Sequence, residues 1–136
     1  MGAWAEDSFG NDAACDWGGS FLADPGLAAL REAIQTVIDT DDYLDSYEAC
    51  QCLAACEVIA RAQGKWGLRN SYSEELDRWI EANPIAIPED LKTAADEAIA
   101  RILGDDSELV ALWDDGGRNE VWHGAIDDLR QRVKGE

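Results

Sequence analysis

The chain has 136 residues, 46% of them apolar, and a formal net charge of −18 from 29 acidic and 11 basic residues. This length and composition indicate one folded domain with its own hydrophobic core. Because so acidic a surface repels phosphate groups and anionic lipids, we expect no nucleic-acid partner and no membrane association.

The N-terminus lacks the basic region and the apolar stretch of a secretion signal. Met1-Gly2 fits the start of a myristoylation motif, but Glu6 stands where that motif needs serine or threonine. No apolar run approaches the roughly 20 residues of a membrane-spanning helix. We therefore expect a cytoplasmic protein, in which cysteines stay reduced.

The first predicted element follows the stretch "GAWAEDSFGNDAACDW", residues 2–17. Asn11 is a good N-cap, and the negative charge of Asp12 in the first turn interacts favourably with the helix dipole. Asp16 lies inside the same helix, four residues after Asp12, where like charges repel, so its carboxylate needs a partner. Backbone amides of residues 2–4 and the indole N–H of Trp4 are the nearest candidates. We interpret the motif as a clamp that holds residues 1–10 against this helix and buries Asp16, with a ligand site as the alternative.

The same stretch resembles the signature of a family of small bacterial proteins known only as a domain of unknown function. The pattern of that family is Met-Gly-x-Trp-Gly, followed by Phe-x-Asn-Asp-x-Ala-x-Asp-Trp. Ala5 departs from it, because the family has glycine there. The resemblance implies family membership and no particular reaction. The matching residues are Met1, Gly2, Trp4, Phe9, Asn11, Asp12, Ala14, Asp16 and Trp17.

Apolar residues at helical spacing predict two further helices in the first half of the chain. Asp24-Pro25 supplies an N-cap and a first-turn proline for a helix that runs to about Thr40. The acidic stretch that follows opens the next helix, which stops at Gly64. The candidate N-caps of that helix are Thr40, Asp41 and Asp42.

Four more helices are predicted in the second half. The first ends at Asn83-Pro84, and the second ends at Gly104. No stretch shows the sustained two-residue alternation of a strand. We therefore predict an all-α single domain over residues 1–136, a bundle of about six or seven short helices with under about a tenth of its residues in strands. The start signals of these four helices are the capping box Ser71-x-x-Glu74, Pro88, Ser107 and Asn119.

The cysteines and the histidine do not combine into a recognisable site. Small apolar residues surround the thiols, so we interpret the cysteines as free, mostly buried core residues rather than zinc ligands. His123 is the only histidine, which leaves di-iron and catalytic-triad schemes incomplete. The run from Asp39 lacks the glycine and the final glutamate of a calcium loop. The sequence nominates no catalytic residue, no cofactor and no metal site. The four cysteines are Cys15, Cys50, Cys52 and Cys56.

Six tryptophans are many for this length. Trp17, Trp79 and Trp122 fall on apolar stripes and are predicted core residues. Trp66 and Trp113 lie close to loops, so we take them as candidates for a partner interface, with core packing as the alternative.

Acidic residues are concentrated in the first part of the chain. Residues 1–49 hold eleven acids against Arg31 alone, whereas residues 50–136 hold eighteen acids and ten bases. The densest run lies at a predicted helix entrance, where we expect a partner-binding patch. Its residues are Asp39, Asp41, Asp42, Asp45 and Glu48.

Three functions fit these observations. The first is a non-enzymatic binding module that engages a basic protein, as immunity proteins and nucleic-acid mimics do. The second is a small metal-assisted enzyme that uses clustered carboxylates, around Asp12 and Asp16 for example. The third is a housekeeping interaction domain without a charge-driven role. The sequence leaves the oligomeric state and the identity of any partner open.

Overall fold

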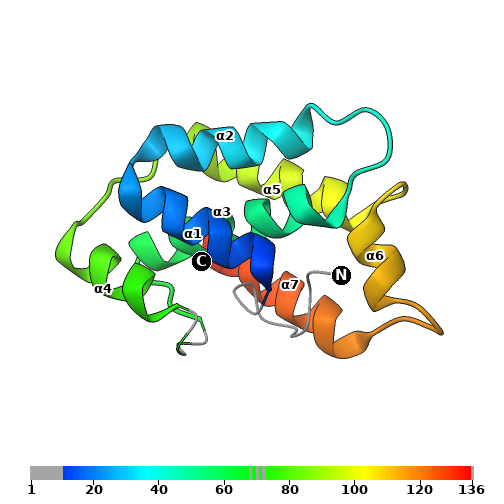
Figure 1. Cartoon of the computed structure of the whole chain (residues 1–136). Helices are drawn as coiled ribbons and strands as arrows, with labels where there is room; N and C mark the ends of the chain where they lie inside the picture. Colours follow the sequence, from blue (N-terminus) through cyan, green and yellow to red (C-terminus); the bar gives the residue numbers. More distant parts are fainter. Residues whose placement is uncertain (1–10, 68, 70, 72, 136) are drawn as a thin grey trace.

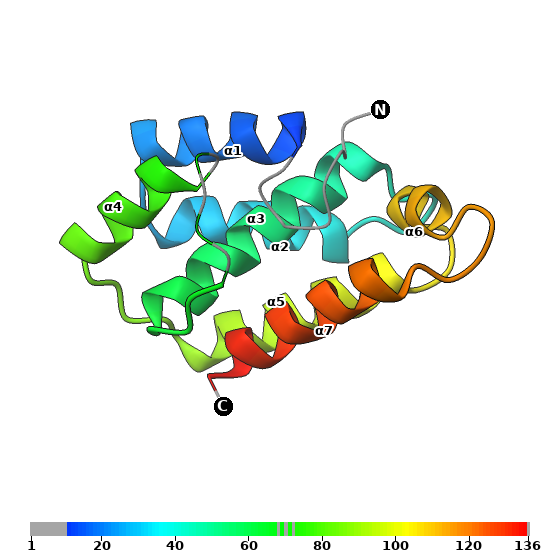
Figure 2. The same ribbon diagram turned by 90° about the horizontal axis from the view of Figure 1, so that it is seen from below.

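A long central helix, α3 (Ser46–Ala62), organises the fold. Its own side chains are mostly small or apolar around the whole helix, and twelve of its seventeen residues are buried. A helix that is apolar all round must be covered by other elements. α3 accordingly contacts each of the other six helices that the structure describes (Figures 1 and 2).

The computed structural model describes residues 11–67, 69, 71 and 73–135, and these form seven helices and no strand. The predicted all-α single domain is confirmed for this part of the chain. α2 packs on α3 and α5, and α7 packs on α3 and α5, so that α5 closes the side of the bundle opposite α1 (Figure 2). None of the described helices is long and apolar enough to cross a membrane. The remaining helices are α1 (Asp12–Ala23), α2 (Leu27–Ile38), α4 (Glu74–Ala82), α5 (Glu89–Leu103), α6 (Glu108–Trp113) and α7 (Glu120–Lys134).

Two predicted helix starts in the first half are wrong by a few residues. α2 begins at Leu27 rather than at Pro25, because Gly26 precedes it with φ 147°, a conformation that glycine adopts without strain. α3 begins after Asp45, whose carboxylate accepts a hydrogen bond from the Glu48 backbone N–H at 3.1 Å. The loop before it is therefore longer than expected, and the predicted caps at Thr40–Asp42 lie within that loop.

One of the two predicted serine starts is also wrong. α4 begins after Ser73 instead of Ser71, and the Ser73 hydroxyl donates to the Asp77 carboxylate at 2.8 Å rather than capping the helix. Ser107 precedes α6 without a side-chain cap bond. The asparagine caps are confirmed, since Asn11 accepts from the Ala14 N–H at 2.7 Å and Asn119 accepts from the Trp122 N–H at 3.0 Å.

The core contains most of the predicted aromatic and sulfur residues. Trp17 and Trp122 are buried, whereas Trp79 is half-buried at the rim and meets Phe21 edge-on with ring centroids 5.2 Å apart. No disulfide joins the cysteines, all of which lie in the described part of the chain; the three on α3 are buried and Cys15 on α1 is exposed. Burial raises the pKa of Cys50 to about 12, so this thiol is unreactive.

Candidate functional site

Two acidic loops lie side by side at one end of the bundle. The α2–α3 loop carries the predicted patch, and the α5–α6 loop adds acids that the sequence analysis did not select (Figure 1). The Leu44 N–H donates to the Asp106 carbonyl at 2.8 Å, and the Glu108 N–H donates to the Leu44 carbonyl at 2.9 Å. The acidic face thus consists of Asp39, Asp41, Asp42, Asp45, Glu48, Asp105 and Asp106.

One arginine holds the two loops together from α5. The Arg101 guanidinium donates to the carbonyls of Thr40 and Asp42 in one loop and of Asp105 and Asp106 in the other. Within the described part of the chain, its donors therefore bind backbone oxygens and make no hydrogen bond to an acidic side chain. This contact fixes both loops although their carboxylates repel one another.

The carboxylates of the acidic face crowd one another most closely at the start of α3. Desolvation raises the pKa of Glu48, and the nearby charges of Asp45 and Asp42 raise it further. The other members of the predicted patch are exposed, and Asp39 accepts a hydrogen bond from Gln35 at 2.8 Å. The structure thus brings the five predicted residues together at one surface.

Two tyrosines stand on the same surface. Tyr43 is 55% exposed and Tyr47 is 50% exposed, on either side of Asp45 in the sequence. Tyrosine is common in protein interfaces because it offers an apolar ring together with a hydrogen-bonding hydroxyl. The sequence analysis did not select either tyrosine. The signal that could have found them is the presence of two aromatic residues within one acidic run.

The two interface candidates among the tryptophans are both half-buried. Trp113 ends α6 and lies parallel to Trp122, with ring centroids 6.1 Å apart. Trp66 follows α3, where the guanidinium groups of Arg69 and Arg61 lie 4.3 and 5.8 Å from its ring centroid. Trp66 and the acidic face thus lie at opposite ends of α3, about 25 Å apart by the rise of an α-helix.

The N-terminal motif is described only in part. Asn11 caps α1, and Trp17 is buried beneath α2. The predicted burial of Asp16 is wrong, because Asp16 lies on the outer side of α1 and is exposed, as is Asp12 one turn earlier. Trp4, Phe9 and the rest of residues 1–10 lie outside the described residues, and so does the predicted clamp.

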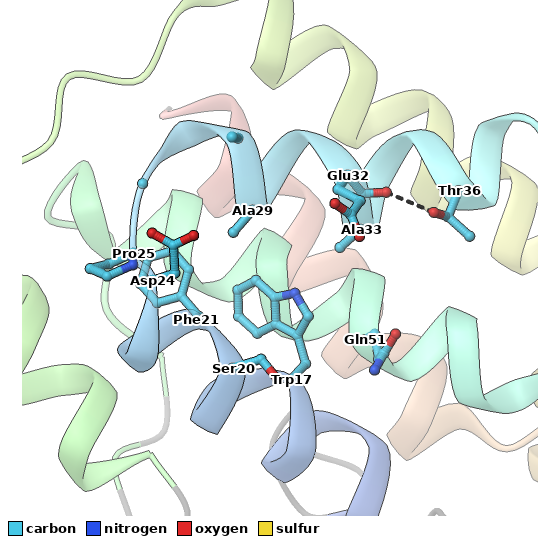
Figure 3. A pocket seen from close by; sticks show the side chains of 12 residues that line it. Trp17, Ser20, Phe21, Asp24, Pro25, Ala29, Glu32, Ala33, Thr36 and Gln51 are labelled. Atoms are coloured by element: carbon cyan, nitrogen blue, oxygen red, sulfur yellow. Dashed lines mark hydrogen bonds between the residues drawn. The ribbon is translucent and has the colours of Figure 1, made fainter.

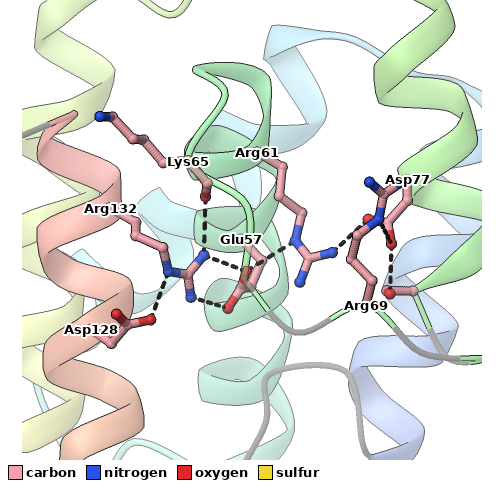
Figure 4. Close-up of polar contacts among 8 residues, drawn as sticks. Glu57, Arg61, Lys65, Arg69, Asp77, Asp128 and Arg132 are labelled. Carbon is pink, nitrogen blue, oxygen red and sulfur yellow. Dashed lines mark hydrogen bonds and ion pairs between the residues drawn. The ribbon is translucent and has the colours of Figure 1, made fainter.

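A buried network of charged side chains joins α3, α4 and α7 (Figure 4). Glu57 accepts from Arg61 at 3.1 Å and from two nitrogens of Arg132 at 2.9 Å, and Arg61 reaches the Asp77 carboxylate at 2.5 Å. Burial would raise the pKa of Glu57, but the hydrogen bonds and charges of Arg132 and Arg61 outweigh it and lower this pKa. These groups satisfy one another, so the network serves folding rather than catalysis.

A histidine–aspartate pair closes the turn between α6 and α7. His123 Nε2 lies 2.9 Å from Asp114 Oδ2, and the Asn119 N–H donates to Asp114 Oδ1 at 2.9 Å. The Asn119 bond, followed by the His123 contact, lowers the pKa of Asp114. The pair orients the start of α7. Within the described residues, no group of three or more histidine, cysteine, aspartate or glutamate side chains is placed to hold a metal ion.

Comparisons with known proteins place the chain in a family. A model described as "Domain of unknown function (DUF4259)" matches residues 2–125, so the chain belongs to this family. This confirms the membership that the N-terminal motif predicted. No curated protein and no solved structure matches the chain.

Proposed function

We propose that this member of the DUF4259 family is a non-enzymatic binding module whose acidic face engages a basic protein. The observation that carries the proposal is the pairing of two acidic loops on one surface, whose seven carboxylates outweigh the positive charge of Arg101 between them. Arg101, the nearest arginine, directs its donors to backbone carbonyls. Opposite charges would steer a basic partner to such a surface and orient it there.

The distribution of the basic side chains supports this proposal. Every other arginine forms an ion pair with a carboxylate outside the acidic face. Apart from the charge of Arg101, the negative charge of the face is therefore left for a partner. The exposed rings of Tyr43 and Tyr47 add contact area and can stack against arginine side chains. The seven arginines concerned are Arg31, Arg61, Arg69, Arg78, Arg118, Arg130 and Arg132.

A metal-assisted enzyme and a housekeeping interaction domain are the alternatives. The first was suggested by Asp12 and Asp16, which are both exposed and stand one helical turn apart on α1. No specific contact favours either alternative, whereas the paired loops favour a charged interface.

The test uses the protein as bait at low ionic strength. Changing Asp41, Asp42 and Asp45 to asparagine removes three charges from the face while keeping an N-cap for α3, because asparagine caps as well as aspartate. We expect basic proteins on the wild-type bait and their loss from this triple variant. A matched triple variant carries Glu75→Gln, Glu97→Gln and Asp127→Asn, three exposed acids on other helices, and should retain them. Equal capture by both variants would contradict the proposal.

A further inference from the structure

A groove with a volume of about 390 Å³ lies between α1 and α2 (Figure 3). Its apolar wall is formed by Trp17 and Phe21 from α1 and Ala29 and Ala33 from α2. This volume falls in the range of about 300–1,000 Å³ typical of clefts that bind ligands. The short alanine side chains of α2 leave the space open.

Trp17 offers this groove a hydrogen-bond donor. Its side chain is only 7% exposed, and its ring stacks on Phe21 at a centroid distance of 5.2 Å. The indole Nε1–H donates to no acceptor in the described part of the chain. Because this nitrogen is open to solvent at the groove rather than buried, it can donate to an acceptor on a bound molecule in place of water.

The rim of the groove is acidic. Asp24 and Glu32 contribute carboxylates at its edge, and no lysine or arginine is among the described residues that line it (Figure 3). A cleft with one apolar wall and a negative rim fits an apolar group that is flanked by positive charge. A peptide carbonyl next to that group would accept from the Trp17 indole in place of water.

The groove opens toward the acidic face. On α2, its lining residue Thr36 stands one turn before Thr40 and donates to the Glu32 carbonyl, while the Thr40 hydroxyl donates to the Thr36 carbonyl. On α3, its lining residue Gln51 stands one turn after Tyr47, on the same side of the helix. One extended segment of a partner can therefore contact both surfaces.

We propose that the groove binds an apolar side chain, of leucine size, from the same basic segment that the acidic face attracts. Trp17 Nε1 donates to a backbone carbonyl of that segment, and Glu32 and Asp24 pair with its lysine or arginine side chains. The inference rests on the proposed function and explains how the partner would be selected. Charge brings the segment to the protein, and the groove then selects segments that carry the apolar side chain. It also gives Trp17, the last residue of the N-terminal motif, a role beyond the core.

Two fluorescent peptides of equal charge test the groove, Arg-Lys-Arg-Leu-Arg-Lys-Arg and the same peptide with serine in place of leucine. At one fixed ionic strength, we expect the wild-type protein to bind the leucine peptide about tenfold more tightly, because one buried leucine contributes that much. The leucine peptide should also shift the Trp17 indole N–H resonance more than the serine peptide does.

Filling the groove should remove the advantage of leucine and leave the charge-driven binding. Ala29→Phe fills it from α2, and Ser20→Phe, at an exposed position on α1, does so from the other wall without a core change. The control is Ala100→Phe, at an exposed alanine on α5 that does not line the groove, and it should keep the tenfold preference. Circular dichroism verifies the helix content of each variant.

Two results would overturn the groove proposal and leave the acidic face intact. One is equal affinity of the wild-type protein for both peptides, and the other is a leucine preference that persists in both filled variants. If neither peptide bound the wild-type protein, the proposed function itself would fail together with the inference.

Discussion

Single residues of the acidic face are placed where their charge opposes folding. Desolvation, Asp45 and Asp42 raise the pKa of Glu48, so its ionised form is less stable in the folded protein than in the unfolded chain. A carboxyl with a raised pKa reduces stability at every pH above that raised pKa. The reduction disappears as the pH falls below the ordinary value for glutamate. The charge of Glu48 thus lowers the stability of the folded protein and does not contribute to holding it together.

Glu48→Gln should therefore raise the melting temperature at pH 7, and the gain should shrink as the pH falls below the ordinary pKa of glutamate. The substitution removes the charge and keeps the shape. Thermal unfolding followed by circular dichroism at pH 7 and at acidic pH measures the effect. Glu97→Gln, at an exposed acid on α5, serves as the control and should change little. A lower melting temperature at pH 7 would show that the Glu48 charge stabilises the fold.

The N-cap of α1 provides a second residue-scale prediction. Asn11 is buried, and its side chain accepts the Ala14 N–H at 2.7 Å, so Asn11→Ala should cost about 1 kcal/mol of unfolding free energy. Asn83→Ala is the control, because Asn83 is exposed at the end of α4 and should cost less. Urea unfolding of both variants gives the comparison, and equal losses would contradict a capping role for Asn11.

Whether a side chain's role could be predicted from the sequence depended on how local its contacts are. Asn11 and Asn119 bond within three residues of themselves, and both caps were predicted. Glu57 meets Arg132 across 75 residues of chain, so no local pattern could pair them. The i, i+4 pair of Glu57 and Arg61 inside an otherwise apolar run was the one available signal. Asp16 was expected to be buried because its repulsion from Asp12 seemed to need a partner, yet solvent screens both exposed charges.

At the scale of elements, α3 fixes the positions of its neighbours through a few buried charges. The Glu57 carboxylate pairs with two arginines of the network, Arg61 on α3 and Arg132 on α7. Removing one member of a buried ionic group leaves the others uncompensated, which is far more damaging than losing a surface pair. The network therefore sets how α7 and α4 dock on α3.

Glu57→Gln should lower the unfolding free energy by about 3–5 kcal/mol, measured by urea unfolding. Asp128→Asn is the matched control, because Asp128 pairs with the same Arg132 at 2.8 Å but is largely exposed, and it should lose at most about 1 kcal/mol. Because the pKa of Glu57 is lowered, its contribution is present at neutral pH and is lost as the pH falls through that lowered pKa. The difference between Glu57→Gln and the wild-type protein should accordingly shrink in acid. Similar losses in both variants at pH 7 would contradict a buried charge network.

Element identities were predicted better than their boundaries. Apolar spacing and glycine or proline stops placed all seven described helices, because these signals are local. The starts of α2, α3 and α4 were displaced by residues whose roles depend on the fold. Ser73, for example, binds Asp77 within the buried network instead of capping α4.

For the whole molecule, folding decides which acids act together. The sequence indicated the patch before α3, since its residues lie within ten positions of one another. Asp105 and Asp106 join them only because Arg101 and the Leu44–Ser107 bridge bring two distant loops together. That arrangement adds two carboxylates to the five of the predicted patch, and no pattern within either loop could predict it.

The most direct measurement is the association rate constant of a captured basic partner as a function of ionic strength. Charges on an exposed face are screened within about 8 Å at physiological salt, so the rate constant of the wild-type protein should fall steeply as salt is raised. The variant with Asp41, Asp42 and Asp45 changed to asparagine should start lower and fall less, with an unchanged or higher melting temperature. The variant with Glu75, Glu97 and Asp127 neutralised should follow the wild-type protein. A rate constant that is insensitive to salt, or equal losses in both triple variants, would contradict the account.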